Sequence, residues 1–247
     1  MRGRLGRVGV LVGGVAVVLA VVFCVRADAG SDSRPPAPVA GASALPALRI
    51  MPLGSSSTVG AGSLDTAGFR QPLEVLLTRD GIAYDMVGSQ QSGPLSMADR
   101  DHEGHGGWTM ALMQPQLVGW MVRQHPDLVL LQVGTNDLLA GTPAATVAQR
   151  LDTMLTTIRA TSSAGVIVAG VWAPLRTRLA ARAEYARLAA TVVARHRFAG
   201  EHVTFADTST LLGPGDLFDG LHPDAAGYRK VADMWEREIR SFLAVRS

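Results

Sequence analysis

The sequence has 247 residues, of which 47% are hydrophobic and 18% are charged. This length and composition suit one ordinary domain with a sizeable core, and they exclude a disordered polymer as the main body. The formal net charge is +2, but the first 29 residues hold four arginines and one aspartate, so the remaining residues carry −1. No basic stripe with interleaved aromatic residues is present, and nucleic acid is therefore not expected as a partner. Cys24 is the one cysteine, which excludes a disulfide framework.

The N-terminus has the pattern of a secretory signal. Three arginines precede an apolar run over residues 8–25, and the small-x-small sequence Ala27-Asp28-Ala29 follows it. We predict that residues 1–29 are a signal peptide. An apolar run of this length is also near the minimum for a membrane span, so an uncleaved signal anchor is the alternative.

The segment after the signal is rich in alanine, serine, proline and glycine. This composition predicts a flexible linker over residues 30–46, followed by a single folded domain over residues 47–247. The predicted protein is secreted. In the alternative, it contacts the membrane only through its N-terminal segment, with the domain outside the cytoplasm.

Short apolar runs alternate with longer amphipathic or alanine-rich stretches along the predicted domain. The apolar runs predict buried strands at residues 47–53, 83–87, 127–133, 166–171 and 202–205. The longer stretches predict helices at residues 68–78, 108–124, 142–161, 179–197 and 223–243. A polar, glycine-rich segment, 89–107, is predicted to be a long loop. This alternation predicts a parallel sheet covered by helices on both faces.

Polar residues follow several of the predicted strands, at the edge where parallel sheets gather their reactive groups. The first strand leads into a serine cluster, and the second leads into a loop that ends in glycines and a tryptophan. An asparagine turn follows the third strand, and an Asp-x-x-His sequence follows the last strand.

These residue types are the components of a serine esterase. A serine hydroxyl is a poor nucleophile until a base takes its proton, and histidine can be that base near neutral pH. A carboxylate three residues before the histidine can accept its other N–H and fix the tautomer. Backbone N–H groups and an asparagine amide can stabilise the oxyanion.

Four separated blocks, in this order, resemble those of the SGNH/GDSL hydrolases. The blocks are Leu53-Gly54-Ser55-Ser56, Gly107, Gly134-Thr135-Asn136-Asp137 and Asp219-x-x-His222-Pro223. The resemblance extends over residues 49–235. Within that superfamily, residues 50–54, 87–89, 99–109 and 219–223 resemble carbohydrate esterases of the acetylxylan esterase type.

The resemblance implies a fold and a set of roles. The fold is a flavodoxin-like three-layer α/β/α sandwich with a parallel five-stranded sheet. Ser56 would be the nucleophile, His222 the general base and Asp219 the residue that orients it. The oxyanion donors would be the N–H groups of Ser56 and Gly107 and the side chain of Asn136. Such chemistry needs no cofactor.

The expected function is that of a secreted serine ester hydrolase that deacetylates carbohydrate through an acyl-enzyme. A polysaccharide or small-molecule ester would be its substrate. One alternative is a general short-chain esterase or lipase of the same superfamily. Another is a non-catalytic protein that binds carbohydrate or the cell envelope on the same fold. Its only support is Ser55, which stands where the family usually has aspartate.

Several further residues have two interpretations. Trp108 and Trp172 could stack on a sugar ring, or they could pack in the core. His102 and His105 could suggest a metal site, but the neighbouring acidic residues crowd into the same loop, and no metal is expected. Asp137 is interpreted as a structural hydrogen-bonding residue. The remaining histidines are interpreted as surface or edge residues: His125, His196 and His202.

Overall fold

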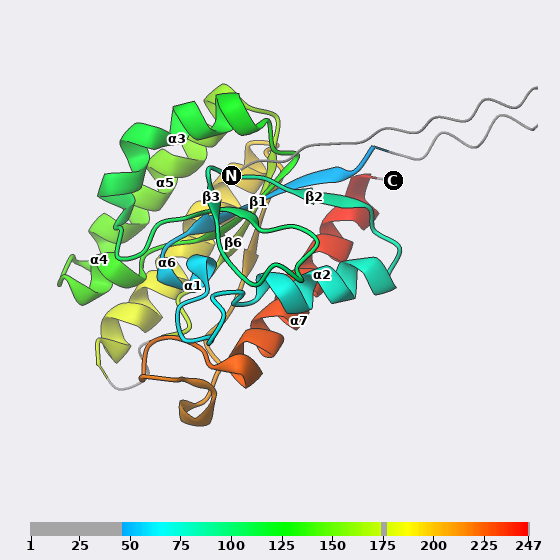
Figure 1. Ribbon diagram of the computed structural model, residues 1–247. Coiled ribbons are helices and arrows are strands. Elements are labelled where there is room, and N and C mark those ends of the chain that lie inside the picture. Colours follow the sequence, from blue (N-terminus) through cyan, green and yellow to red (C-terminus); the bar gives the residue numbers. More distant parts are fainter. Residues whose placement is uncertain (1–45, 174–176, 247) are drawn as a thin grey trace, which may run out of the picture. The chain divides into compact units, whose positions relative to one another are not determined.

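The computed structural model describes residues 46–173 and 177–246 (Figure 1). The strands are β1 (Leu48–Gly54), β2 (Tyr84–Met86), β3 (Gln90–Gln91), β4 (Asp101–Gly104), β5 (Leu128–Gln132), β6 (Gly165–Ala169) and β7 (Val203–Ala206). The helices are α1 (Ser56–Val59), α2 (Arg70–Arg79), α3 (Met110–Gln124), α4 (Thr135–Leu139), α5 (Ala144–Thr161), α6 (Leu179–Phe198) and α7 (Ala225–Arg246). A short 3-10 helix, η1, spans Pro214–Asp216.

The strands within these residues form one sheet in the order β3-β4-β1-β5-β6-β7, with β2 also paired to β1. All pairings are parallel except that of β3 with β4. β2 pairs with residues 48–50 of β1 and β4 with residues 53–54, so the two short strands occupy successive parts of one edge of β1. The parallel sheet therefore has five strand positions, and β3 adds an antiparallel edge.

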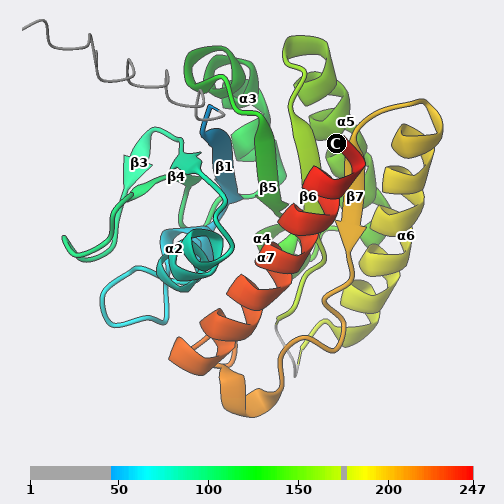
Figure 2. The same cartoon turned by 90° about the vertical axis from the view of Figure 1, so that its right-hand side faces the viewer.

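Helices cover the sheet on both faces, as Figure 2 shows. The apolar residues of β5 and β6 alternate between the two faces because successive side chains of a strand point to opposite sides. Val129 and Leu131 join a core with α3, α5 and α6. Leu130 and Ile167 join a second core with α2 and α7. The predicted three-layer α/β/α fold is therefore confirmed.

The chain leaves β1 on one side to form β2 and returns on the other side as β5. A ligand site is expected at such a switch point, beyond the carboxyl ends of the strands. The two short helices, α1 and α4, begin there, directly after β1 and β5. Neither helix was predicted, because four or five residues are too few to show a helical period.

The predicted loop over residues 89–107 is partly wrong, because it contains β3 and β4. β4 has the sequence Asp-His-Glu-Gly and lacks an apolar run, although His102, Glu103 and Gly104 are buried. The predicted signal segment 1–29 and nearly all of the predicted linker 30–46 lie outside the described residues. No helix among the described residues is long and apolar enough to cross a membrane.

Candidate active site

The turn after β1 places Ser56 at the first position of α1. A Cβ at Gly54 would collide with Thr58 Oγ1 and with the carbonyl oxygen of Gln132, so glycine is required for this close approach. Ser55 precedes α1 without a side-chain capping hydrogen bond and is buried. At the start of a helix, the first N–H groups have no intrahelical acceptor, which leaves the N–H of Ser56 available to a ligand.

Ser56, His222 and Asp219 form a continuous path of hydrogen bonds. The Ser56 Oγ lies 2.9 Å from His222 Nε2, and His222 Nδ1 lies 2.7 Å from Asp219 Oδ2. Because an ionised carboxylate only accepts, His222 carries its proton on Nδ1, and Nε2 is left to accept the serine proton. The structure thus brings together the three residues that the sequence singled out from two distant segments.

Asp219 is held as a carboxylate by its neighbours. Its Oδ1 accepts the backbone N–H groups of Leu221 at 3.0 Å and of His222 at 2.8 Å. Burial alone would raise the pKa of Asp219, but these bonds and the His222 imidazole outweigh it and lower the pKa to about 2. Asp219 therefore stays ionised throughout the pH range in which a histidine titrates.

The loop that carries His222 packs tightly against the loop after α1. A Cβ at Gly62 would collide with the Pro223 carbonyl oxygen and would lie 2.9 Å from His222 Cβ. The hydroxyl of the buried Tyr228, on α7, donates to the carbonyl oxygen of Ala61. These contacts fix the position of the loop that carries His222 relative to α1.

A tight turn over residues 105–108, the 105–108 turn, lies next to the end of β1. The Trp108 N–H donates to the His105 carbonyl oxygen at 3.2 Å, and Gly107 has a φ of 78°. A positive φ at the third residue is the pattern of a type II turn, which favours glycine there. The His105 N–H donates to the Gly54 carbonyl oxygen at 2.9 Å, which connects this turn to the turn that carries Ser56.

The start of α4 is attached to the same turn. Asn136 Nδ2 donates to the Trp108 carbonyl oxygen at 2.8 Å. An amide nitrogen has two N–H groups, so one remains for a ligand. Asp137 is buried and accepts the Met110 N–H at 3.0 Å, and Arg150 donates to its other oxygen at 2.6 Å. The structural interpretation of Asp137 is thus confirmed, and this carboxylate holds the first turn of α3 beside α4.

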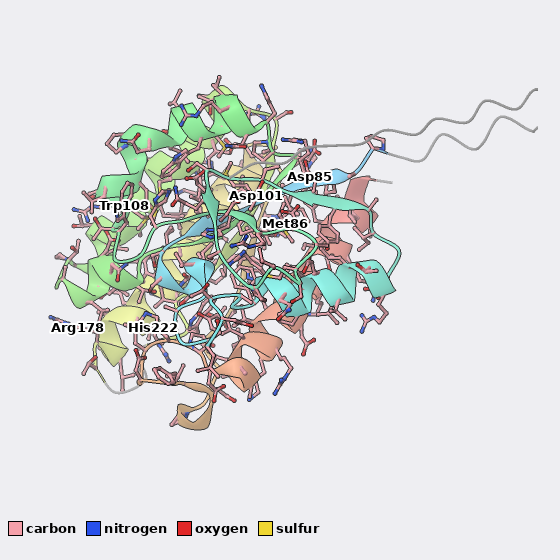
Figure 3. The ribbon with its side chains drawn as sticks, in the orientation of Figure 1. Asp85, Met86, Asp101, Trp108, Arg178 and His222 are labelled. Carbon is pink, nitrogen blue, oxygen red and sulfur yellow. The ribbon has the colours of Figure 1, made fainter. Side chains whose placement is uncertain are left out.

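The two candidate substrate tryptophans differ in exposure. Trp108 is partly exposed, and its ring stacks on the ring of His105 at a centroid distance of 4.4 Å. Trp172 is 2% exposed and packs with the core between the sheet, α2 and α7. Its prediction as a sugar-stacking residue is therefore not supported, because its ring surface is covered by protein. Trp108 comes from the turn before α3 and His222 from the loop before α7 (Figure 3).

The residues once considered for a metal site bind other protein groups instead. His102 accepts the Gly104 N–H through Nδ1 at 2.9 Å, and its Nε2 lies 2.8 Å from Ser92 Oγ. Burial, with the positive charge of Arg70 nearby, lowers the pKa of His102 to about 3. The ring is therefore neutral, and its Nε2–H donates to Ser92.

His196 was predicted to be a surface or edge residue, and this prediction is wrong. Its ring is buried between Glu201, 2.7 Å from Nδ1, and Asp152, 2.9 Å from Nε2. A histidine in a helix was assigned to the surface because its polarity alone suggests exposure. Two carboxylates compensate for its burial.

Arg70 is a structural residue that sequence reasoning missed. Its guanidinium is buried and donates to the carbonyl oxygens of Thr58 and Val59 at the end of α1, and to the carbonyl oxygen and hydroxyl of Ser92. Burial is the main reason why the pKa of Arg70 falls to about 10. No sequence pattern could reveal this role, because most of its partners are backbone carbonyl groups.

Comparison with known protein families gives one extended match. The model of the GDSL-like lipase/acylhydrolase family matches residues 53–230. A multidomain esterase of Ruminococcus flavefaciens is 27% identical over 233 residues, which cover 81% of this chain and 29% of that protein. The chain thus spans less than a third of that relative.

Solved structures of similar fold include two carbohydrate esterases. The family 3 carbohydrate esterase of Clostridium thermocellum is 32% identical with a TM-score of 0.71, over 81% of this chain and 100% of that one. A family 3 carbohydrate esterase of Talaromyces cellulolyticus has a TM-score of 0.68 with the same coverage. Its 24% identity shows likeness of fold alone.

Proposed function

Because the chain belongs to the GDSL-like lipase/acylhydrolase family, we propose that it is a serine ester hydrolase that removes acetyl groups from carbohydrate. The family is one of carboxylic ester hydrolases. The observation that carries the proposal is the hydrogen-bond path from Asp219 through His222 to Ser56 Oγ, at 2.7 Å and 2.9 Å.

In the first half of the proposed reaction, Ser56 becomes acetylated. Its Oγ attacks the ester carbonyl carbon while His222 Nε2 takes the hydroxyl proton, and Asp219 stabilises the imidazolium. The oxyanion of the tetrahedral intermediate accepts N–H groups of Ser56, Gly107 and Asn136. The bond to the leaving alcohol then breaks, and that alcohol takes the proton from His222.

In the second half, water replaces the alcohol. His222 removes a proton from a water molecule, whose oxygen attacks the acetyl carbon of the acyl-enzyme. The same N–H groups stabilise the second oxyanion. The bond to Ser56 Oγ breaks, acetate leaves, and the proton returns from His222 to the serine. The cycle uses only groups of this chain and water.

Carbohydrate as the alcohol component rests on two observations. The Clostridium thermocellum structure, 32% identical, is that of a carbohydrate esterase. The partly exposed ring of Trp108 adjoins Gly107, where a sugar carrying the acetyl group could stack. Acetylated xylan is the polymer we propose to test first. A general short-chain esterase or lipase remains the second candidate.

A panel of esters tests this proposal. Wild type is expected to hydrolyse a chromogenic acetate ester faster than the matching octanoate and to release acetate from acetylated xylan, and Ser56→Ala is expected to do neither. Preference for octanoate would favour the lipase candidate. Hydrolysis by Ser56→Ala equal to that of wild type would exclude Ser56 as the nucleophile. An inactive wild type would favour the non-catalytic alternative, for which Ser55 is the only support.

We further propose export, on the signal-like pattern of residues 1–29. The mass of the protein recovered outside the cells is expected to lack these residues. Recovery of the full-length chain in the membrane fraction would instead support the signal anchor.

A further inference from the structure

We infer that His105, held by Glu103, is the positioning residue of the 105–108 turn, and this inference rests on the proposed ester-hydrolase function. Two of the three proposed oxyanion donors depend on that turn. The Gly107 N–H belongs to it, and Asn136 is bound to its last residue through the Trp108 carbonyl oxygen. Whatever sets the position of this turn therefore sets the oxyanion geometry.

The tip of the turn has little packing of its own. Apart from the adjoining residues of the chain, no atom lies within 4 Å of the position where a Cβ would stand at Gly106 or at Gly107. Support must therefore come from the base of the turn, where the backbone of His105 makes two hydrogen bonds. Its N–H donates to Gly54, two residues before Ser56, and its carbonyl oxygen accepts the Trp108 N–H.

The ring of His105 packs against two tryptophan rings, whose own centroids lie 6.3 Å apart. It stacks on Trp108 at a centroid distance of 4.4 Å and an interplanar angle of 22°. It also stacks on Trp120 of α3 at 4.9 Å and 13°. Near-parallel rings at these distances are in favourable contact, so the imidazole links the turn to the buried face of α3.

The edge of the ring is fixed by a buried carboxylate. His105 Nε2 lies 2.7 Å from Glu103 Oε1, and the Glu103 side chain is 0% exposed. The same carboxylate accepts the Ser89 hydroxyl at 2.7 Å and the Ser89 N–H at 2.8 Å. Glu103 lies on β4 opposite Leu53 of β1. A fully paired carboxylate beside the nucleophile strand thus determines where His105, and with it the turn, can lie.

The variant His105→Phe tests the inference, because phenylalanine keeps a ring in contact with the two tryptophans and loses the bond to Glu103. A displacement of the donors is expected to lower kcat about 10- to 100-fold with little change in KM, since oxyanion contacts act on the transition state. His202→Phe is the matched control, at an exposed histidine before β7 and at the opposite end of the strands from the site. Its kcat should equal that of wild type.

A double-mutant cycle with Asn136→Ala distinguishes a displacement of the oxyanion donors from a general loss of order in the His105→Phe variant. Asn136→Ala alone is expected to lower kcat about 10²- to 10³-fold. If His105 acts through the same oxyanion site, the combined loss will be smaller than the product of the two single losses. A combined loss equal to that product, or a kcat for His105→Phe equal to that of His202→Phe, would overturn the inference.

Two further measurements keep the result interpretable. Should His105→Phe fail to fold, Ser89→Ala removes the hydroxyl donor to Glu103 at an exposed position and keeps the backbone N–H donor, and it should lower kcat about two- to fivefold. An unchanged kcat there would count against the inference. Ser56→Ala is measured in parallel. If it stays active, the proposed function fails, whereas an inactive Ser56→Ala with a fully active His105→Phe refutes only the role of His105.

Discussion

Two histidine–carboxylate pairs adjoin the turn after β1, and both have a nitrogen–oxygen distance of 2.7 Å. In the pair Asp219–His222 the side chains are 44% and 19% exposed. In the pair Glu103–His105 they are 0% and 13% exposed. The nitrogen–oxygen distance therefore does not distinguish the two pairs. The difference between them must lie in the groups that surround each pair.

The second contact of each imidazole provides the distinction. His222 uses its other nitrogen to meet the Ser56 hydroxyl, so it can exchange a proton with the reacting group. The ring of His105 packs against those of Trp108 and Trp120, so it is held in place. In our proposals, the pair Asp219–His222 moves a proton and the pair Glu103–His105 holds a turn in place. The comparison teaches that a short histidine–carboxylate contact does not by itself indicate a catalytic pair, and that the partner of the second ring nitrogen must also be known.

Removal of His222 is expected to have the largest effect. His222→Ala leaves Ser56 without a base, and kcat should fall about 10⁵- to 10⁶-fold, as expected when one member of a triad is lost. Steady-state hydrolysis of a chromogenic acetate ester measures this loss, with His125→Ala, at an exposed position, as the control. A loss below about tenfold would place His222 outside the proposed catalytic group.

The next largest effect is expected from changing the carboxylate of one pair to an amide, and kcat should respond differently in the two pairs. In Asp219→Asn, the amide oxygen must keep accepting two backbone N–H groups, which turns its NH₂ toward His222 Nδ1. That reverses the tautomer, so Nε2 cannot take the serine proton, and kcat should fall about 10³- to 10⁴-fold.

The same change at Glu103 should be tolerated. In Glu103→Gln, the amide oxygen can accept the Ser89 N–H, and the NH₂ group can donate to His105 Nε2. This changes the tautomer of His105, but the change should do little harm because His105 transfers no proton in the proposed reaction. We expect kcat to stay within about tenfold of wild type. Equal losses in Asp219→Asn and Glu103→Gln would contradict the division of roles.

His102 extends the comparison to stability. The pKa of this buried ring is about 3 when folded and about 6.5 for an unperturbed histidine. Between those values the unfolded chain binds a proton that the folded one does not. The contribution of His102 to the free energy of unfolding should therefore fall by about 1.4 kcal/mol for each pH unit between about pH 6.5 and about pH 3.

Urea unfolding of wild type and His102→Gln between pH 7 and about pH 4 measures this contribution. The variant is expected to be less stable at pH 7 and to show the shallower pH dependence. Parallel curves for the two proteins would show that His102 does not titrate as its burial predicts.

Ser55→Asp is expected to have the smallest effect. The end of α1 is already held by the guanidinium of Arg70 through Thr58 and Val59. Restoring the usual family residue should therefore leave kcat within about threefold of wild type. Complete inactivation would mean that the turn depends on serine, and the same acetate assay would detect it.

Much of the fold could be predicted because its strands are continuous apolar runs. The five apolar strands were placed within two residues at each end. β4 was not predicted because its buried residues are polar. Local hydrogen bonds, such as that of His102 with Gly104, compensate for their burial, and such bonds leave no hydrophobic pattern in the sequence. The helices α1 and α4 are each shorter than two turns, and their residues were interpreted as turns.

The candidate site was predictable where residues of a reactive type directly follow a predicted strand. Ser56 follows β1 and Asn136 follows β5, and parallel strands bring these ends together. The supporting contacts were not predictable. The stacking of His105 on Trp120 depends on how α3 packs, and the contrast between Trp108 and Trp172 depends on which ring the core covers.

The central claim, that Ser56 is the nucleophile completing the Asp219–His222 pair, is tested most directly by covalent labelling. Three serines are consecutive, so a phosphonate ester that phosphonylates activated serines, followed by peptide mapping, can distinguish Ser55, Ser56 and Ser57. We predict label on Ser56 alone, full labelling in Ser57→Ala and almost none in His222→Ala. Label on Ser55 or Ser57, or undiminished labelling of His222→Ala, would contradict the account.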